Sequence, residues 1–271
     1  MINFFTSPLE QFLVIPVFLL DFSNYFCISI TNSVIILIVV LYLFFHLTSA
    51  LFNRKSMKKE FSLFEVKESI NSFSIIPNRI QSCIELIYKL MLGLVGDNIK
   101  NKDNVKYFPL VYFLYLFILF VNLIGLVPFS VTLTSQIIVT VSFSVAIFIG
   151  INIIAVKRHG KHFFTLFIPS GTSPVLALIL VPIELISYVC KPISLSIRLF
   201  ANMMAGHTLL KVIAGFGVVM ASFAGLFAFA YLVPALILLP LFVLELAVAV
   251  IQAFVFSTLI CIYLNDALNL H

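Results

Sequence analysis

The sequence predicts an all-α integral membrane protein with about five membrane helices and one amphipathic surface helix. The last two membrane helices are predicted to be long, kinked and strongly tilted, and to form a hairpin. Hydrophobic residues make up 62% of the 271 residues, charged residues make up 10%, and the mean hydropathy is +1.18. Soluble proteins carry about 25% charged residues, and apolar runs of bilayer-spanning length recur along this chain. We therefore expect one membrane domain over 1–271 and no separate catalytic domain.

The first apolar run, 28–47, is long enough to cross a bilayer, and the block NRKSMKKE that follows it marks one membrane face. We assign 48–106 as a charged segment on the inner side. Within it, 80–96 carries apolar residues at helical spacing, which predicts an amphipathic helix lying on the membrane surface. These apolar residues are Ile80, Ile84, Ile87, Leu90, Met91 and Leu94.

Two further spans are predicted at 107–127 and 133–156, and the short connection around Pro128 makes them a hairpin. Ten of the 16 basic residues lie in 48–106, and three more lie in the loop 157–162. With this arrangement of spans both basic segments face the same side, which the positive-inside rule assigns to the cytoplasm or the mitochondrial matrix. The N-terminus is then outside and the C-terminus inside.

The final two elements, 174–220 and 229–264, are longer than a simple span requires. Pro182 and Pro192 are expected to kink the first of them, because neighbouring helices can satisfy the carbonyls that proline frees. At about 1.5 Å per residue this helix would be about 70 Å long, against a hydrocarbon core of about 30 Å. We therefore expect both helices to tilt steeply, with a turn at 221–225.

A polar stripe is predicted along the first of these helices. Glu184, Lys191 and Arg198 are seven residues apart, so they share one helix face, and Asn202 continues it. A charge at the centre of a membrane helix costs at least about 2.5 to 3.5 kcal/mol. Arginine cannot escape that cost by losing its proton, so we interpret Arg198 as functional.

The other polar residues allow more than one interpretation. Glu245 and Gln252 repeat the seven-residue step on the last helix, and His207, about half a turn round from Arg198, is expected to face that helix. Glu184 and Lys191 are either a spaced structural pair, residues that snorkel to the interface, or part of a functional path.

Nothing in the sequence predicts a cofactor, a metal ion or a nucleotide. The four cysteines are scattered and form no C-x-x-C pair, so neither a zinc site nor a haem attachment is indicated. No G-x-x-x-x-G-K-[ST] loop is present, so we expect no ATP binding by this chain. We also expect no nucleic-acid partner.

Four stretches carry a resemblance to a known family. SIRLFANMMAGH (196–207) and ELAVAVIQAFVFSTL (245–259) resemble the signature of subunit a of F-type ATP synthases. The resemblance extends to VNLIGLVP (121–128), and SPLEQF (7–12) is similar to mitochondrial members. It implies the stator proton channel of a rotary motor, located in the mitochondrial inner membrane with the N-terminus on the intermembrane-space side and the C-terminus on the matrix side.

The resemblance also implies roles and partners. The family arginine that matches Arg198 faces a carboxylate on a rotor ring of small hairpin subunits, and four further residues match polar positions of the proton path: Asn202, His207, Glu245 and Gln252. The implied partners are that ring, the peripheral stalk and the other ATP synthase subunits, the lipid bilayer and protons. The chain would then be the proton-translocating part of an enzyme complex.

Electrostatics extends this assignment to further residues. An ionised rotor carboxylate in low dielectric must meet a cation, which Arg198 supplies. Protons would enter from the outer side through His207, Glu245, Gln252 and Asn122, because an imidazole and a carboxylate can hold and pass protons. Glu184, Lys191 and Ser194 would line the exit toward the inner side, so that transport proceeds through two offset half-channels.

Three rival functions fit the sequence less well. A secondary ion transporter with charged residues at the membrane midplane would suit broken helices, but the sequence has no internal repeat. A haem or copper subunit would need two pairs of axial ligands, and only His46 and His207 lie in apolar runs. A structural scaffold would leave Arg198 unexplained.

Overall fold

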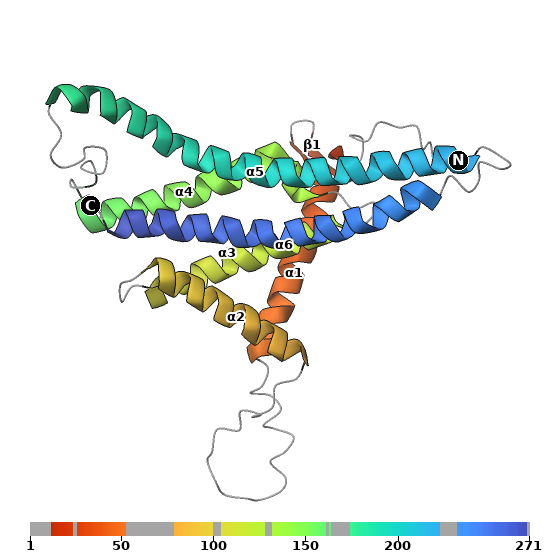
Figure 1. The fold of residues 1–271 in the computed structure, drawn as a ribbon, viewed down its shortest axis with the longest axis horizontal. Coiled ribbons are helices and arrows are strands. Elements are labelled where there is room, and N and C mark those ends of the chain that lie inside the picture. Colours follow the sequence, from red (N-terminus) through yellow and green to blue (C-terminus); the bar gives the residue numbers. More distant parts are fainter. Residues whose placement is uncertain are drawn as a thin grey trace, which may run out of the picture.

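The computed structural model describes residues 12–23, 26–52, 79–99, 104–127, 132–160, 163, 174–222 and 232–269. The elements in chain order are β1 (Pro16–Ser23), β2 (Phe26–Thr31), α1 (Asn32–Phe52), α2 (Arg79–Asn98), α3 (Asn104–Gly125), the short 3-10 helix η3 (Leu133–Ser135), α4 (Ile137–His159), α5 (Pro174–Ser222) and α6 (Leu232–Leu268) (Figure 1).

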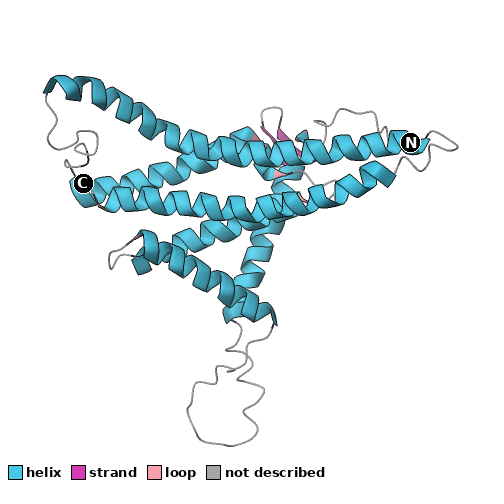
Figure 2. Cartoon of the chain, viewed as in Figure 1, coloured by secondary structure: helices cyan, strands magenta, loops and turns pink. Residues whose placement is uncertain are grey.

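The predicted all-α membrane class is confirmed, and helices make up nearly all of the described chain (Figure 2). Within the described ranges, four helices are long and apolar enough to span a membrane. These are Val105–Gly125 in α3, all of α4, Leu178–Ala221 in α5, and α6. A shorter apolar stretch, Asn32–His46, lies in α1. The predicted turn around Pro128 lies outside the described residues, as do residues 223–225 of the turn predicted at 221–225 and most of the charged segment that precedes α2. Residues 221 and 222 still belong to α5.

An antiparallel hairpin precedes the first helix, and the sequence analysis did not predict it. β1 pairs with β2 in a register that sets Pro16 opposite Thr31. The predicted start of the first span at Ile28 is therefore wrong, since the helix begins at Asn32. A short apolar run fits a strand as well as a helix by periodicity, and here β2 takes the first part of the run.

Asn32 ties the chain that leads into the hairpin to the start of α1. Its side chain donates a hydrogen bond to the Leu13 carbonyl at 3.2 Å and accepts one from the Ile15 amide at 3.4 Å. The backbone amide of Asn32 donates to the Ile15 carbonyl at 3.1 Å. These bonds hold residues 13–15 against the start of α1. The preceding residue, Phe12, packs its ring edge-on against the ring of His207 on α5, with ring centroids 6.3 Å apart.

The centre of the bundle is α3. Half of the most apolar stretch of α3 is buried, compared with 17% of the corresponding stretch of α4, 11% of that of α5 and 17% of that of α6. It packs against α1, α2 and α6, while α5 packs against α4 and α6. The main core combines residues of α2, α3 and α6, including Met91, Val111 and Phe256, all fully buried. Because α5 has few buried residues, most of its surface is left for lipid or for another protein.

The amphipathic helix predicted at 80–96 corresponds to α2, which runs from Arg79 to Asn98. Ile84, Met91 and Leu94 from the predicted apolar stripe are buried, whereas Leu90 is exposed. Tyr88 remains exposed yet stacks edge-on against Phe108 of α3, with ring centroids 4.9 Å apart. The apolar side of α2 therefore packs against the rest of the bundle.

The two long helices run side by side and cross α1 at a steep angle (Figure 1). α5 has 49 residues, with Pro182 and Pro192 inside it, and it bends in Figure 1. At about 1.5 Å per residue it extends about 73 Å, more than twice the hydrocarbon thickness of about 30 Å. If α1 crosses the bilayer, α5 and α6 lie far from its normal.

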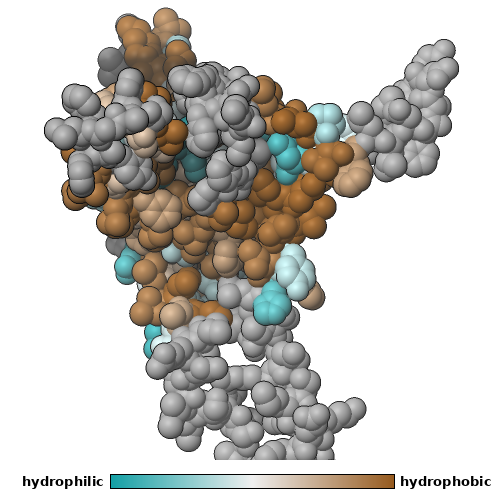
Figure 3. Space-filling model, turned by 90° about the vertical axis from the view of Figure 1, so that its right-hand side faces the viewer, coloured by the Kyte–Doolittle hydropathy of each residue, from teal (hydrophilic) through white to brown (hydrophobic). Residues whose placement is uncertain are grey.

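Hydrophobic side chains cover much of the surface in Figure 3. Large apolar residues are exposed along both long helices, for example Ile186 and Ile197 on α5 and Leu239 and Ile251 on α6. A soluble monomer rarely exposes apolar area on this scale. In a membrane protein, lipid tails or apolar partner helices cover such faces.

Candidate functional site

Two residues of the stripe predicted on α5, Lys191 and Asn202, contact α6, and the contacts between the two helices follow an antiparallel order. Asn202 donates a side-chain hydrogen bond to Gln252 at 2.9 Å. Three turns earlier on α5, the Lys191 ammonium lies 3.6 Å from the Asp266 carboxylate. As the residue number decreases along α5, the number of the contacting residue on α6 increases. Because of this antiparallel order, polar residues that repeat every seven positions on each helix come together.

Glu245 lies against the small residue next to His207. A Cβ atom built on Gly206 would lie 2.8 Å from Cδ and 2.9 Å from Cγ of Glu245, closer than side chains normally approach. Only glycine leaves room for the carboxyl group at this point of α5. The Glu245 side chain is 5% exposed although its helix is otherwise mostly apolar.

Neither Glu245 nor His207 has its hydrogen bonds satisfied in the part of the chain that the structure describes. Both carboxyl oxygens of Glu245 and Nε2 of His207 are buried without a partner. His207 was predicted to face the last helix. The structure shows Glu245 against Gly206, the residue next to His207, but no hydrogen bond between His207 and Glu245. A buried carboxyl group without partners is unfavourable unless it binds a proton or water, and both suit a group that passes protons.

A third helix joins this site through Asn122. Its side chain is fully buried on α3, and its Nδ2 donates to the Ala249 carbonyl of α6 at 3.3 Å. Its Oδ1 has no partner among the described residues, and the same holds for Nε2 of the buried Gln252. We call this group of polar residues from α3, α5 and α6 the polar seam. Its members are Asn122, Asn202, His207, Glu245 and Gln252.

Arg198 lies one turn before Asn202, and its side chain is exposed. It lies within electrostatic range of Tyr263 on α6, and within the described ranges no carboxylate is close enough to pair with it. Its neighbours Ile193 and Ile197 are exposed apolar residues. The structure therefore presents an unpaired cation on an apolar face beside one end of the polar seam.

Lys191 is held by a cluster that the sequence analysis did not predict. Its ammonium lies 5.4 Å from the ring centre of Tyr188 and 5.1 Å from that of Tyr263, in addition to its contact with Asp266. The Tyr188 hydroxyl donates a hydrogen bond to Oδ1 of Asn152 on α4. The acidic partner of Lys191 is therefore Asp266 and not Glu184, so the interpretation of Glu184 and Lys191 as a pair is wrong.

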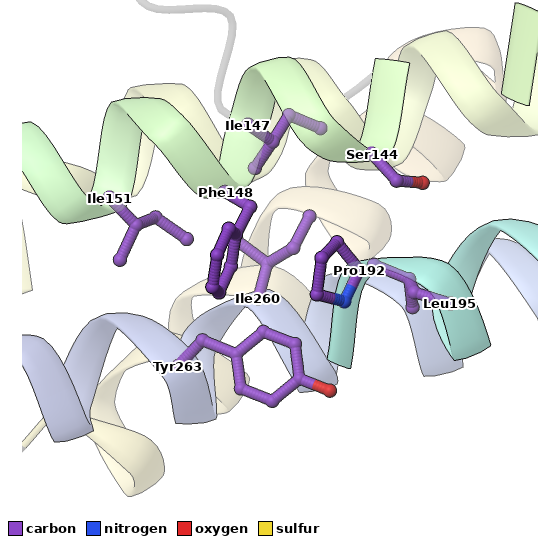
Figure 4. Close-up of a pocket in the computed structure, with 8 residues that line it drawn as sticks. All are labelled: Ser144, Ile147, Phe148, Ile151, Pro192, Leu195, Ile260 and Tyr263. Atoms are coloured by element: carbon purple, nitrogen blue, oxygen red, sulfur yellow. The ribbon is translucent and has the colours of Figure 1, made fainter. Parts of the chain in front are cut away.

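A small pocket adjoins this cluster where α4, α5 and α6 meet. Figure 4 shows its lining residues, which are Ser144, Ile147, Phe148, Ile151, Pro192, Leu195, Ile260 and Tyr263. The lining is mostly apolar, and Tyr263 links it to Lys191. Of the other predicted exit residues, Glu184 is half-buried and Ser194 is exposed, and neither belongs to the polar seam.

Asp266 could have been noticed in the sequence, because it lies two residues beyond the apolar run that ends at Leu264. Its contact with Lys191 depends on the register between α5 and α6, which residue spacing on one helix does not fix. Within the described residues, no three His, Cys, Asp or Glu side chains are grouped so that they could hold a metal ion.

Comparisons with known proteins agree on one family. The family described as ATP synthase A chain matches residues 30–265. A protein of Pylaiella littoralis named ATP synthase subunit a is 48% identical over 268 residues, which cover 98% of this chain and 100% of that protein. Proteins of the same name from Chondrus crispus and Rhodospirillum rubrum are 44% and 38% identical, each covering 98% of this chain, with 97% and 99% of their own length matched.

Proposed function

Because the chain belongs to the ATP synthase subunit a family, we propose that it is the stator proton-channel subunit of a rotary ATP synthase, which couples proton flow to rotation and ATP synthesis. The observation that supports this most strongly is the unpaired Arg198 on an apolar helix face next to the polar seam. A permanent cation at such a place has a purpose if a mobile carboxylate arrives there from another protein.

The partner at this face is a ring of small hairpin subunits with a carboxyl group at mid-membrane depth. The exposed apolar residues around Arg198 suit contact with apolar helices of the ring. A protonated carboxyl group crosses the lipid as a neutral group, whereas an ionised one needs Arg198 beside it. The same fixed charge repels protons and so opposes a direct leak past the ring.

Protons reach the ring from the outer side through the polar seam. His207 and Glu245 hold and pass them, while Asn122, Asn202 and Gln252 orient the water between these groups. Unsatisfied buried oxygens and nitrogens are what such a route requires, because they bind water that an apolar core excludes.

Protons leave toward the inner side along the other part of α5. Glu184, Lys191 and Ser194 line that exit, and Asp266 joins them through its contact with Lys191. The exit and the polar seam therefore lie at different points along the same two helices. This separation makes two offset half-channels, which forces a proton to travel with the ring between them.

The chain contributes to an enzyme complex without carrying out the nucleotide chemistry itself. Partner subunits bind ATP, and a peripheral stalk holds this chain against the ring. The complex resides in the mitochondrial inner membrane, with the N-terminus on the intermembrane-space side and the C-terminus on the matrix side. The stretch SPLEQF (7–12), which is similar to mitochondrial members, supports this location.

Co-purification tests the function directly. The chain, isolated from its native membrane, is expected to bring an oligomeric ring of small proteins, each with one mid-membrane carboxylate, and ATP hydrolysis by the complex is expected to acidify vesicles that contain it. A chain that purifies without a ring, and that transports a solute when reconstituted alone, would instead indicate the rival secondary transporter.

Gly206→Ala is expected to lower passive proton conductance through the membrane sector severely. The new methyl group would occupy the space of the Glu245 carboxyl group, and a displacement that raises the barrier by about 1.4 kcal/mol slows transfer about tenfold. Gly215→Ala on the same helix is the matched control, since a Cβ atom there meets nothing within 4 Å. Proton flux into vesicles with an imposed potential is the measurement, and equal flux in both variants would contradict the role of this contact.

A further inference from the structure

The last part of the connection between α3 and α4, residues 132–135, is buried in the bundle. Leu133 of η3 forms a buried cluster with Val40 of α1 and Val121 of α3. Val40 lies eight residues after Asn32, where α1 begins, which corresponds to a depth of about 12 Å along that helix. In a membrane, backbone that is not helical is tolerated at such depth only where protein buries it or where it lines water.

Two hydroxyl groups of this connection have no hydrogen-bond partner within the described residues. Thr132 is fully buried and Thr134 is 5% exposed, and Oγ1 of each is unpaired. Two other buried hydroxyls donate to the preceding turn of their own helix: Thr140 bonds to the Ile137 carbonyl at 3.0 Å, and Ser257 bonds to the Ala253 carbonyl at 2.9 Å, whereas the buried hydroxyl of Ser144 also lacks a partner among the described residues. Such bonds to the previous turn are the usual outcome for Ser and Thr in apolar helices. Thr132 and Thr134 lie outside the α-helices and make no such bond within the described residues, although Ser135 of η3 donates to the Thr132 carbonyl at 2.6 Å.

Thr132 is close to the polar seam. A Cβ atom on Gly125 of α3 would lie 2.6 Å from Cγ2 and 3.4 Å from Cβ of Thr132, so the threonine side chain covers that glycine. Asn122 lies three residues earlier on α3, on the same face, about 4.5 Å along the helix axis. Its Oδ1 is unpaired, while its Nδ2 bonds to Ala249, one turn from Glu245.

We propose that Thr132 and Thr134 hold ordered water at the outer end of the polar seam, and that this water, which Asn122 orients, delivers protons to Glu245. A buried water needs two to four polar partners, and unpaired oxygens of Thr132 and Asn122 provide them on adjoining elements. Each hydroxyl can donate one hydrogen bond and accept another, so it can orient the water molecules along which a proton moves. The hydroxyl itself neither gains nor loses a proton overall. The inference rests on the proposed function and adds the route between the outer side and the polar seam.

Hydroxyl removal tests the relay in the assembled complex. Thr132→Val and Thr134→Val keep the volume approximately and remove the water ligand, so passive proton conductance is expected to fall several-fold in each, and Thr132→Ser is expected to restore it. Thr140→Val is the matched control, because that buried hydroxyl is already bonded to its own helix. Parental conductance in both Thr132→Val and Thr134→Val, with the ring still bound, would overturn the proposal.

Thiol accessibility tests the water without depending on the relay. In a parent whose four cysteines are replaced by Ala or Ser, Thr132→Cys and Thr134→Cys are expected to react with a small charged methanethiosulfonate added on the outer side, which then blocks conductance. Thr140→Cys is expected not to react. Unreactive thiols at both 132 and 134 would also overturn the proposal. The cysteine-free parent must itself pump protons, and Arg198→Ala in that parent must not. If these two results hold while the threonine variants behave like the parent, the proposed function stands and only the further inference fails.

Discussion

Replacing Arg198 with Ala is expected to abolish ATP-driven proton pumping, while passive proton leak through the complex persists or rises. The guanidinium is exposed on α5 without a carboxylate partner among the described residues, so its removal should leave this chain folded. The ionised rotor carboxylate, however, loses its counter-charge in a low-dielectric interface. An uncompensated buried charge costs about 3 to 5 kcal/mol, which corresponds to a loss of coupled flux of two orders of magnitude or more.

Lys is expected to rescue this variant poorly. An ammonium in an apolar setting can lose its proton, and it lacks the planar fork of donors that meets a carboxylate. The measurement is coupled pumping and passive conductance in vesicles that contain complexes with Arg198→Ala or Arg198→Lys. The nearby Cys190→Ala variant, also exposed on α5, is a control for any general change at this face of the helix. Near-normal pumping in Arg198→Ala would remove this residue from the mechanism.

Exchanging His207 and Glu245 is expected to retain more proton flux than either single replacement. Glu245 contacts the glycine next to His207, and both side chains have unpaired buried atoms, so the two groups share one polar environment. His207→Glu alone places two carboxyl groups there, and Glu245→His alone places two imidazoles. Like groups disfavour simultaneous charging, and each single variant is expected to lose proton flux by about tenfold.

The experiment compares proton uptake by vesicles with the parent, both single variants and the double exchange. The amount of assembled complex must be equal in all four, because a volume change next to Gly206 can disturb packing. A double variant that conducts no better than the worse single variant would show that the two residues do not act as a pair.

Much of the polar site was predictable because membrane helices contain so few polar residues. Arg198 and Asn202 are conspicuous in an apolar sequence, and the four-residue step between them gives their common face without knowledge of the fold. The hydrogen bond between Asn202 and Gln252 is where two such faces meet. The long final helices were equally visible, because no strong stop signal interrupts either run.

The features that were missed depend on contacts between distant segments. The partnership of Asp266 with Lys191 is set by the register of α5 against α6, which depends on packing along the whole pair. Thr132 and Thr134 are common residues in a short connection, and only burial without a partner makes them unusual. β2 was taken for the start of a helix because its apolar side chains suit both structures, and the pairing with β1 that decides between them is a tertiary contact.

The steep crossing of α1 by α5 has a geometric consequence for a rotary machine. Lys191 and Gly206 lie 15 residues apart on α5, about 22 Å along the axis. In a helix perpendicular to the membrane, this distance would separate the two residues mainly in depth. In a helix that lies close to the membrane plane, it would separate them mainly along the circumference of a neighbouring ring. In the proposed function, the angle between the two proton openings, seen from the centre of the ring, would then be set by helix length and tilt. Because the polar seam lies toward one end and the exit toward the other, the left-to-right order of the two openings fixes the sense in which a given proton gradient turns the ring.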